Sequence, residues 1–191
     1  MNDKCENLIN PSWEKHGYIQ VYTGNGKGKT TASLGLAMRA LGRCWKVLII
    51  MFTKGGSDYG ELNSFTNLSP TIQSNLKIIQ AGLDRVVYEK NKTDNDAKAI
   101  NEGWEIAKKA IQNDEYQLII LDEANIAIDL NFIDVDEVVD ILKNKPEEME
   151  IVLTGRNAHP KIVEIAHLVS KIEPIKHYWD TGVVARKGIE Y

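Results

Sequence analysis

The sequence predicts an α/β fold with a mostly parallel sheet and helices on both faces, and three observations lead to this prediction. Segments with strand character alternate with segments with helical character along most of the chain. Val47–Phe52 (VLIIMF) is an uninterrupted apolar run, typical of a strand covered on both faces. Polar clusters follow three of the expected strands, at 24–31, 122–123 and 154–156. Alternating strands and helices form parallel sheets with right-handed crossovers, so a ligand is expected where the strands end.

The expected elements begin after a polar N-terminal stretch. Tyr18–Tyr22 is a short β-prone run that leads into a glycine-rich turn. An Ala- and Leu-rich segment then predicts a helix over Thr30–Leu41, ending at Gly42. The remaining elements show either β-prone runs or apolar residues at helical spacing. They are strands at Val47–Phe52, Leu76–Ile79 (weaker), Tyr116–Leu121 and Glu150–Leu153, helices at Asp94–Ile111, Val135–Leu142 and Pro160–Val169, and mixed strand and loop signals at 170–191.

Length and composition favour one domain, with the proportions of hydrophobic and charged residues that are ordinary for a soluble globular protein. The chain has 191 residues, 43% of them hydrophobic, and a net charge of −4, which disfavours a general nucleic-acid binder. Residues 1–16 are polar and predict a flexible or loosely docked arm, whereas 17–191 are expected to form a single nucleotide-binding domain. The N-terminus lacks an apolar run, and no stretch approaches the roughly 20 apolar residues of a membrane span. We therefore expect no membrane partner and a cytoplasmic location.

The segment TGNGKGKTT at 23–31 is a phosphate-binding loop (P-loop) in the required context, after a strand and at the start of a helix. Glycines let the backbone N–H groups turn toward an anion, and the helix N-terminus adds partial positive charge. The regular pattern begins with glycine, but Thr23 stands at that position here. The alternative is a Gly/Lys-rich surface turn. The residues expected to bind the ATP phosphates are Gly24, Asn25, Gly26, Lys27, Gly28, Lys29, Thr30 and Thr31.

Acidic and basic residues follow two other strands. Asp122 and Glu123 end an apolar strand and, with the Thr30 hydroxyl, are candidate ligands of Mg²⁺; the alternative is that they cap the next helix. Arg156 follows another strand and could grip a phosphate through two hydrogen bonds, or simply face solvent in a turn. Lys29, Thr30, Glu123 and Arg156 are therefore the expected catalytic residues, and Arg156 joins the loop as an expected ATP ligand.

The P-loop by itself does not select a reaction, because kinases, GTPases, motors and transferases share it. Longer strings are more selective. GNGKGKTTASLGLAMRALG, LIILDEANIAI and LTGRNAHPKIVEIAHLVSKIEPIKHYWDTGVVARKGIEY together resemble the ATP:corrinoid adenosyltransferases, over about Gly17 to Tyr191. No guanine-specifying N-K-x-D follows a suitable strand, which disfavours a GTPase.

The resemblance implies a RecA-like P-loop fold, usually in a homodimer. It also implies transfer of the 5′-deoxyadenosyl group of ATP to the cobalt(I) of a reduced corrinoid, with release of triphosphate. A flavoprotein is the implied source of electrons. Such chemistry needs no general base, because the cobalt nucleophile has no proton to lose.

One segment departs from the family pattern. The best-known members carry an aromatic pair shortly after the glycine that corresponds to Gly82, where this chain has Leu83 and Arg85. Gly82, Leu83 and Arg85 are the candidate corrinoid-binding residues, with Tyr88 as a substitute aromatic; the alternative is an ordinary surface loop at 80–90. Two other functions also remain open at this point, a P-loop ATPase or small-molecule kinase and a non-catalytic corrinoid carrier or nucleotide sensor.

Overall fold

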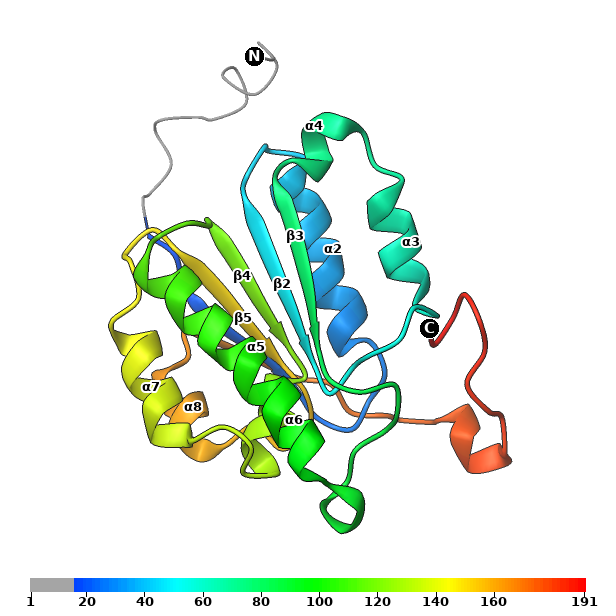
Figure 1. Cartoon of the computed structure of the whole chain (residues 1–191). Helices are drawn as coiled ribbons and strands as arrows, with labels where there is room; N and C mark the ends of the chain where they lie inside the picture. Colours follow the sequence, from blue (N-terminus) through cyan, green and yellow to red (C-terminus); the bar gives the residue numbers. More distant parts are fainter. Residues whose placement is uncertain (1–15) are drawn as a thin grey trace.

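The computed structural model describes residues 16–191, which form a six-stranded sheet with helices on both faces (Figure 1). Neighbouring strands are all parallel, in the order β3-β2-β4-β5-β1-β6. All strands therefore end at one edge, at the bottom of Figure 1. The strands are β1 (Ile19–Thr23), β2 (Val47–Phe52), β3 (Leu76–Ala81), β4 (Leu118–Asp122), β5 (Glu150–Thr154) and β6 (Leu168–Lys171).

Two separate apolar clusters hold the helices to the two faces of the sheet. Ile50 and Phe52 of β2 pack into the larger cluster, whereas Ile49 and Met51 point into the smaller one. Every residue of β2 is consequently buried, which explains its uninterrupted apolar sequence. The larger cluster lies under α5 (Asp94–Gln112), α6 (Ala124–Asp129), α7 (Val135–Lys143) and α8 (Pro160–Ile165), and the smaller under α2 (Lys29–Leu41), α3 (Gly60–Thr66) and α4 (Pro70–Gln73).

The predicted fold class is confirmed, but the helix expected over Pro160–Val169 is wrong at its C-terminal end. Helix α8 stops at Ile165, and Leu168–Lys171 is the edge strand β6. His167 explains the change, because its N–H donates to Ile19 O at 2.8 Å and its Nδ1 accepts from Ile19 N at 3.0 Å. Pairing with β1 thus takes the backbone groups that a longer helix would have used.

Three short helices, α3, α4 and α6, were not predicted. They lie in the connections that follow β2 and β4. Helix α6 lies at the carboxyl edge of the sheet, whereas α4 lies at the opposite edge, at the top of Figure 1, just before β3 begins. The predicted arm falls, apart from its last residue, outside the described part of the chain. Within residues 16–191, no helix combines the length and the apolar character needed to cross a membrane.

Candidate active site

The loop between β1 and α2 wraps around the side chain of its own lysine. Gly24 has φ 95° and Gly28 has φ 117°, backbone conformations that L side chains rarely adopt. Lys29 Nζ donates to Gly24 O at 2.8 Å and to Gly26 O at 2.7 Å. Lys29 is only 7% exposed, and burial is the main cause that lowers its pKa. A polyanion entering the loop would therefore meet an ammonium that is held only by neutral carbonyl groups.

A second hydrogen-bond cluster joins α2 to the ends of β4 and β5. The hydroxyls of Thr30 and Thr154 both donate to Asp122 Oδ1, at 2.9 and 2.7 Å. Thr154 Oγ1 in turn accepts from Glu123 N at 2.9 Å. Asp122 is fully buried, so its carboxylate is fixed in place by these contacts. This arrangement brings together Thr30 and Asp122, two of the three predicted metal ligands.

Lys54 is a site residue that the sequence did not predict. It follows β2, the neighbour of β4, and its Nζ donates to Asp122 Oδ2 at 2.7 Å and to Thr30 Oγ1 at 3.3 Å. Burial acts to lower the pKa of Lys54, but the Asp122 carboxylate, together with Glu123 and Glu61, outweighs burial and raises the pKa, which keeps the side chain protonated. The available signal was its position, since it is a polar residue just beyond a buried apolar strand.

Glu123 is the acidic site residue whose carboxylate is not engaged by another group of the described residues. It has φ 58° and begins α6, and its carboxylate has no hydrogen-bond partner among residues 16–191. Burial, followed by repulsion from Asp122, raises its pKa. No cluster of three or more His, Cys, Asp or Glu side chains suited to a metal occurs in the described part of the chain. A metal at this edge would therefore need the Thr30 hydroxyl and ligands from the nucleotide or water.

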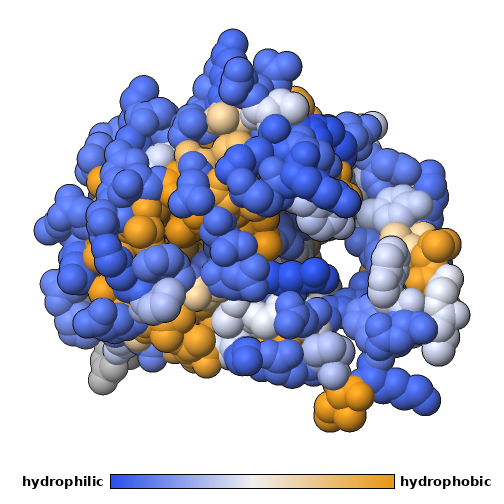
Figure 2. All heavy atoms as spheres, turned by 90° about the horizontal axis from the view of Figure 1, so that it is seen from below, coloured by the Kyte–Doolittle hydropathy of each residue, from blue (hydrophilic) through white to orange (hydrophobic). Residues whose placement is uncertain are grey.

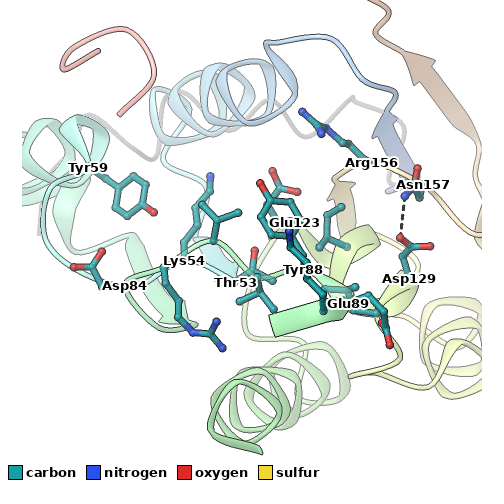
Figure 3. A pocket seen from close by; sticks show the side chains of 16 residues that line it. Thr53, Lys54, Tyr59, Asp84, Tyr88, Glu89, Glu123, Asp129, Arg156 and Asn157 are labelled. Atoms are coloured by element: carbon teal, nitrogen blue, oxygen red, sulfur yellow. Dashed lines mark hydrogen bonds between the residues drawn. The ribbon is translucent and has the colours of Figure 1, made fainter. Parts of the chain in front are cut away.

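Two cavities open at the carboxyl edge of the sheet and share three residues. The P-loop cavity, of about 710 Å³, contains residues 25–31 of the loop. The side cavity, of about 910 Å³, lies between the loop after β3 and the residues that follow β4 and β5. Lys54, Glu123 and Arg156 line both, and in the view of Figure 3 Lys54 and Arg156 lie on opposite sides of Glu123. Gly24 and Asp122, also predicted site residues, line neither cavity.

The C-terminal segment forms one wall of the P-loop cavity, which the mixed signals at 170–191 did not predict. Lys27 Nζ donates to Ile189 O at 2.7 Å and pairs with Glu190 at 3.3 Å. Lys187 pairs with Asp58 at 2.9 Å on the other side. Figure 2, which looks onto this edge, shows an opening between the body of the molecule and the C-terminal segment. The segment is thus tied to the loop by polar contacts at its far end.

The three candidate corrinoid-binding residues have different positions. Arg85 lines the side cavity, but its guanidinium is ion-paired with the buried Asp96 at the start of α5. Gly82 and Leu83 do not line it; a Cβ on Gly82 would lie 2.4 Å from the backbone N of Lys54. Tyr88 does line the cavity and is 56% exposed. The structure therefore gives Gly82 a packing role between two loops.

A parallel sheet with a P-loop after β1 and an acidic residue at the end of β4 defines a nucleotide-binding protein of the P-loop class. The chain belongs to the ATP:corrinoid adenosyltransferase family BtuR/CobO/CobP, whose family model matches residues 15–191. The family resemblance predicted from the sequence is confirmed. The protein is accordingly an enzyme of the alkyl-transferring kind, with ATP and a corrinoid as the implied substrates.

Curated relatives cover almost the same length. The corrinoid adenosyltransferase of Escherichia coli (strain K12) is 32% identical over 191 residues, which are 100% of this chain and 94% of that protein. The corrinoid adenosyltransferase of Sinorhizobium sp is 33% identical over 187 residues, 97% of this chain and 86% of that protein. Among solved structures, the flagellar accessory protein FlaH from Methanocaldococcus jannaschii has a TM-score of 0.59 and 15% identity, covering 89% of this chain and 76% of that chain. This last likeness shows the fold alone.

Proposed function

We propose that the protein transfers the 5′-deoxyadenosyl group of ATP to the cobalt(I) of a reduced corrinoid and releases triphosphate. The observation that carries the proposal is the pair of cavities that meet at Lys54, Glu123 and Arg156. One cavity contains the phosphate-binding loop and suits the triphosphate. The other, of about 910 Å³, lies in the size range of small-molecule sites and suits part of a corrin ring. Their shared boundary is where the two substrates would react.

The bond changes require charge stabilisation and positioning. The cobalt(I) electron pair forms the bond to the ribose C5′ carbon, the C5′–O bond breaks, and its electrons leave with the triphosphate. No proton moves, so the residues need not include a general base. Lys29, Arg156 and the loop N–H groups would stabilise the negative charge that grows on the leaving oxygen. The protein's other tasks are to hold C5′ in line with cobalt and to exclude water.

Mg²⁺ fits the residues present at the P-loop. In the structure the Lys54 ammonium sits between Asp122 Oδ2 and the Thr30 hydroxyl, so these oxygens already accept a cation. Mg²⁺ usually binds one or two carboxylates together with substrate phosphates and water. We assign it to Thr30, Asp122 and Glu123. Bound there, it would neutralise charge on the triphosphate.

The corrinoid would contact the loop after β3. Val86 and Tyr88 on this loop are 66% and 56% exposed and line the side cavity, so they offer apolar surface to a ring. We propose that Tyr88 takes the place of the family's missing aromatic pair. Gly82, Leu83 and Arg85 would then act by shaping the loop.

The test is incubation of the protein with ATP, Mg²⁺ and chemically reduced cobalamin. We expect the optical spectrum to show an adenosyl–cobalt product and the phosphate products to be triphosphate. Glu123→Ala should reduce the magnesium-dependent rate. Release of ADP in place of triphosphate would instead support an ATPase or small-molecule kinase. Binding of both ligands without any product would support a carrier.

Three further proposals rest on the family resemblance. They are a homodimer, a flavoprotein that reduces the corrinoid, and a cytoplasmic location. Light scattering of the purified protein tests the first, and a monomer at micromolar concentration would contradict it. Replacement of the chemical reductant by a reduced flavoprotein tests the second, and separation of cell fractions tests the third.

A further inference from the structure

Lys54 occupies the place of a metal ion between two of its expected ligands. Its Nζ lies 2.7 Å from Asp122 Oδ2 and 3.3 Å from Thr30 Oγ1. The Thr30 hydroxyl is itself directed at the other carboxylate oxygen, at 2.9 Å. A hydroxyl at the start of the P-loop helix and an acid at the end of another strand of the sheet are the groups that hold Mg²⁺ in P-loop proteins. One ammonium therefore occupies the oxygens that the metal would need.

The ammonium and a divalent metal exclude each other at these oxygens. Mg²⁺ needs oxygens at about 2.0–2.1 Å, and a lysine on the same oxygens would be repelled by its charge. Asp122 is 0% exposed, so its carboxylate would be an unpaired buried charge if no cation were present. Lys54 thus keeps Asp122 paired in the free enzyme and has to leave when a metal enters.

The surroundings of Lys54 give it somewhere to move. The side chain is 17% exposed and lines both cavities, so its ammonium can swing away from Asp122 without crossing a packed core. Its backbone lies in the loop after β2, and a lysine stem has several rotatable bonds. The Tyr59 ring lies 5.8 Å from the ammonium and provides a second favourable surface. The triphosphate would bring negative charge into the same P-loop cavity.

We propose that Lys54 is an internal cation that occupies the Asp122 and Thr30 oxygens in the nucleotide-free enzyme and is displaced when the divalent metal arrives with ATP. The inference rests on the proposed magnesium site. Its consequence is that the free enzyme binds divalent metal weakly, and that metal and nucleotide bind together. Displacement moves the ammonium toward the incoming triphosphate, so one positive charge is exchanged for another at Asp122.

The test measures binding of Mn²⁺ alone, without ATP or corrinoid, from the electron paramagnetic resonance signal of the free ion. The key variant is Lys54→Gln, whose amide is neutral and can still donate to Asp122. We expect Mn²⁺ to bind this variant on the order of tenfold more tightly than wild type, or better, because a competing unit charge is gone. Lys98→Gln, at an exposed position on α5, should bind as wild type does. Equal or weaker Mn²⁺ binding by Lys54→Gln would overturn the proposal.

Two more variants test whether the charge of Lys54 causes the effect and whether the metal binds at Asp122. Lys54→Arg keeps the positive charge and should show no gain in Mn²⁺ affinity. A gain of about tenfold by Lys54→Arg would overturn the proposal, and this outcome can be measured even if Lys54→Gln proves too unstable to study. The double variant Lys54→Gln/Asp122→Asn should lose the added affinity, and retention of it would place the metal elsewhere. Because no substrate is present, these results are independent of whether adenosyl transfer occurs.

Discussion

Cationic side chains dominate the polar contacts where the strands end. Lys29 is held by carbonyls of its own loop, Lys54 by Asp122, and Lys27 by the C-terminal segment. Arg156, by contrast, is exposed and lines both cavities. At the scale of single residues, the site is therefore electrostatically arranged before any ligand binds, which lowers the reorganisation needed to receive a polyanion.

Lys29→Ala should almost eliminate adenosyl transfer. The variant loses the buried ammonium that the carbonyl groups of the P-loop hold, and removal of one such preorganised group costs on the order of 10²–10³-fold in rate. Steady-state kinetics with ATP and reduced cobalamin measure the loss. Lys98→Ala is the matched control and should keep the wild-type rate. A Lys29→Ala rate close to wild type would contradict the site.

Arg85→Ala should reduce stability as well as alter corrinoid use. Asp96 is 1% exposed and would lose its ion-pair partner, while Thr93 would still donate to it. Breaking a buried pair costs about 3–5 kcal/mol, and since Arg85 is partly exposed we expect about 1–3 kcal/mol in urea denaturation. Adding Asp96→Asn should restore part of the loss, because the uncompensated charge is then removed. An unchanged denaturation midpoint for Arg85→Ala would contradict this role.

At the scale of elements, close packing between helices and strands sets the positions of the site loops. Gly103 of α5 lies against Ala81, the last residue of β3, and that contact fixes where the following loop begins. Trp104 and Lys108 of α5 both donate to Glu137 of α7, at 2.7 and 2.6 Å. Helix α5 is therefore held both to the sheet and to its neighbour.

Gly103→Ala should destabilise the protein although alanine is the better helix former. The added Cβ would lie 2.3 Å from the Ala81 Cβ, and both atoms are fixed by backbone, so α5 has to shift. We expect a loss of about 1–3 kcal/mol in chemical denaturation. Gly35→Ala in α2 is the control, because no atom lies within 4 Å of its added Cβ. That variant should gain about 0.5–1 kcal/mol, and equal losses in both would refute the packing argument.

Glu137 should make part of the stability dependent on pH. Hydrogen bonds from Lys108 and then Trp104 lower its pKa below the ordinary 4.5. The folded state therefore gains stability that is complete above pH 4.5 and is lost as the pH falls through the lowered pKa. Because Glu137 is exposed, we expect less than about 1 kcal/mol. Melting temperatures of wild type and Glu137→Gln should converge at acid pH, and a constant difference at all pH values would disagree with this origin.

At the scale of the whole molecule, the sheet order brings segments distant in sequence to one edge. Lys54 follows β2, Glu123 follows β4 and Arg156 follows β5, three neighbouring strands that end side by side. The P-loop follows β1, which pairs with β5. The C-terminal segment closes the far side of the P-loop cavity. Two cavities thus share one boundary.

If the two cavities bind different substrates, a substitution in one cavity should affect the KM of one substrate and not of the other. Tyr88 lines only the side cavity and Trp179 only the P-loop cavity, and both are more than half exposed. Tyr88→Ala should raise KM for the corrinoid about 5- to 20-fold, equivalent to about 1–2 kcal/mol of lost contact, and leave KM for ATP almost unchanged. Trp179→Ala should show the opposite pattern. If each variant changed both constants equally, the division into two sites would be wrong.

The sequence by itself determined the class of fold, the P-loop and the acidic end of β4, because each depends on residues close together in the chain. Runs of apolar residues, glycine spacing and Gly28-Lys29-Thr30 are local patterns, and local physics produces strands, turns and helix starts from them.

Tertiary structure alone decided that Lys54 lies on Asp122, that Arg85 pairs with Asp96, and that residues after Ile165 leave the helix to pair with β1. It also decided that the C-terminal segment forms a wall of the P-loop cavity. These contacts depend on which strands are neighbours and on which backbone groups are free at the edge of the sheet. No pattern within a short stretch of sequence contains that information, because it arises only when distant segments pack together.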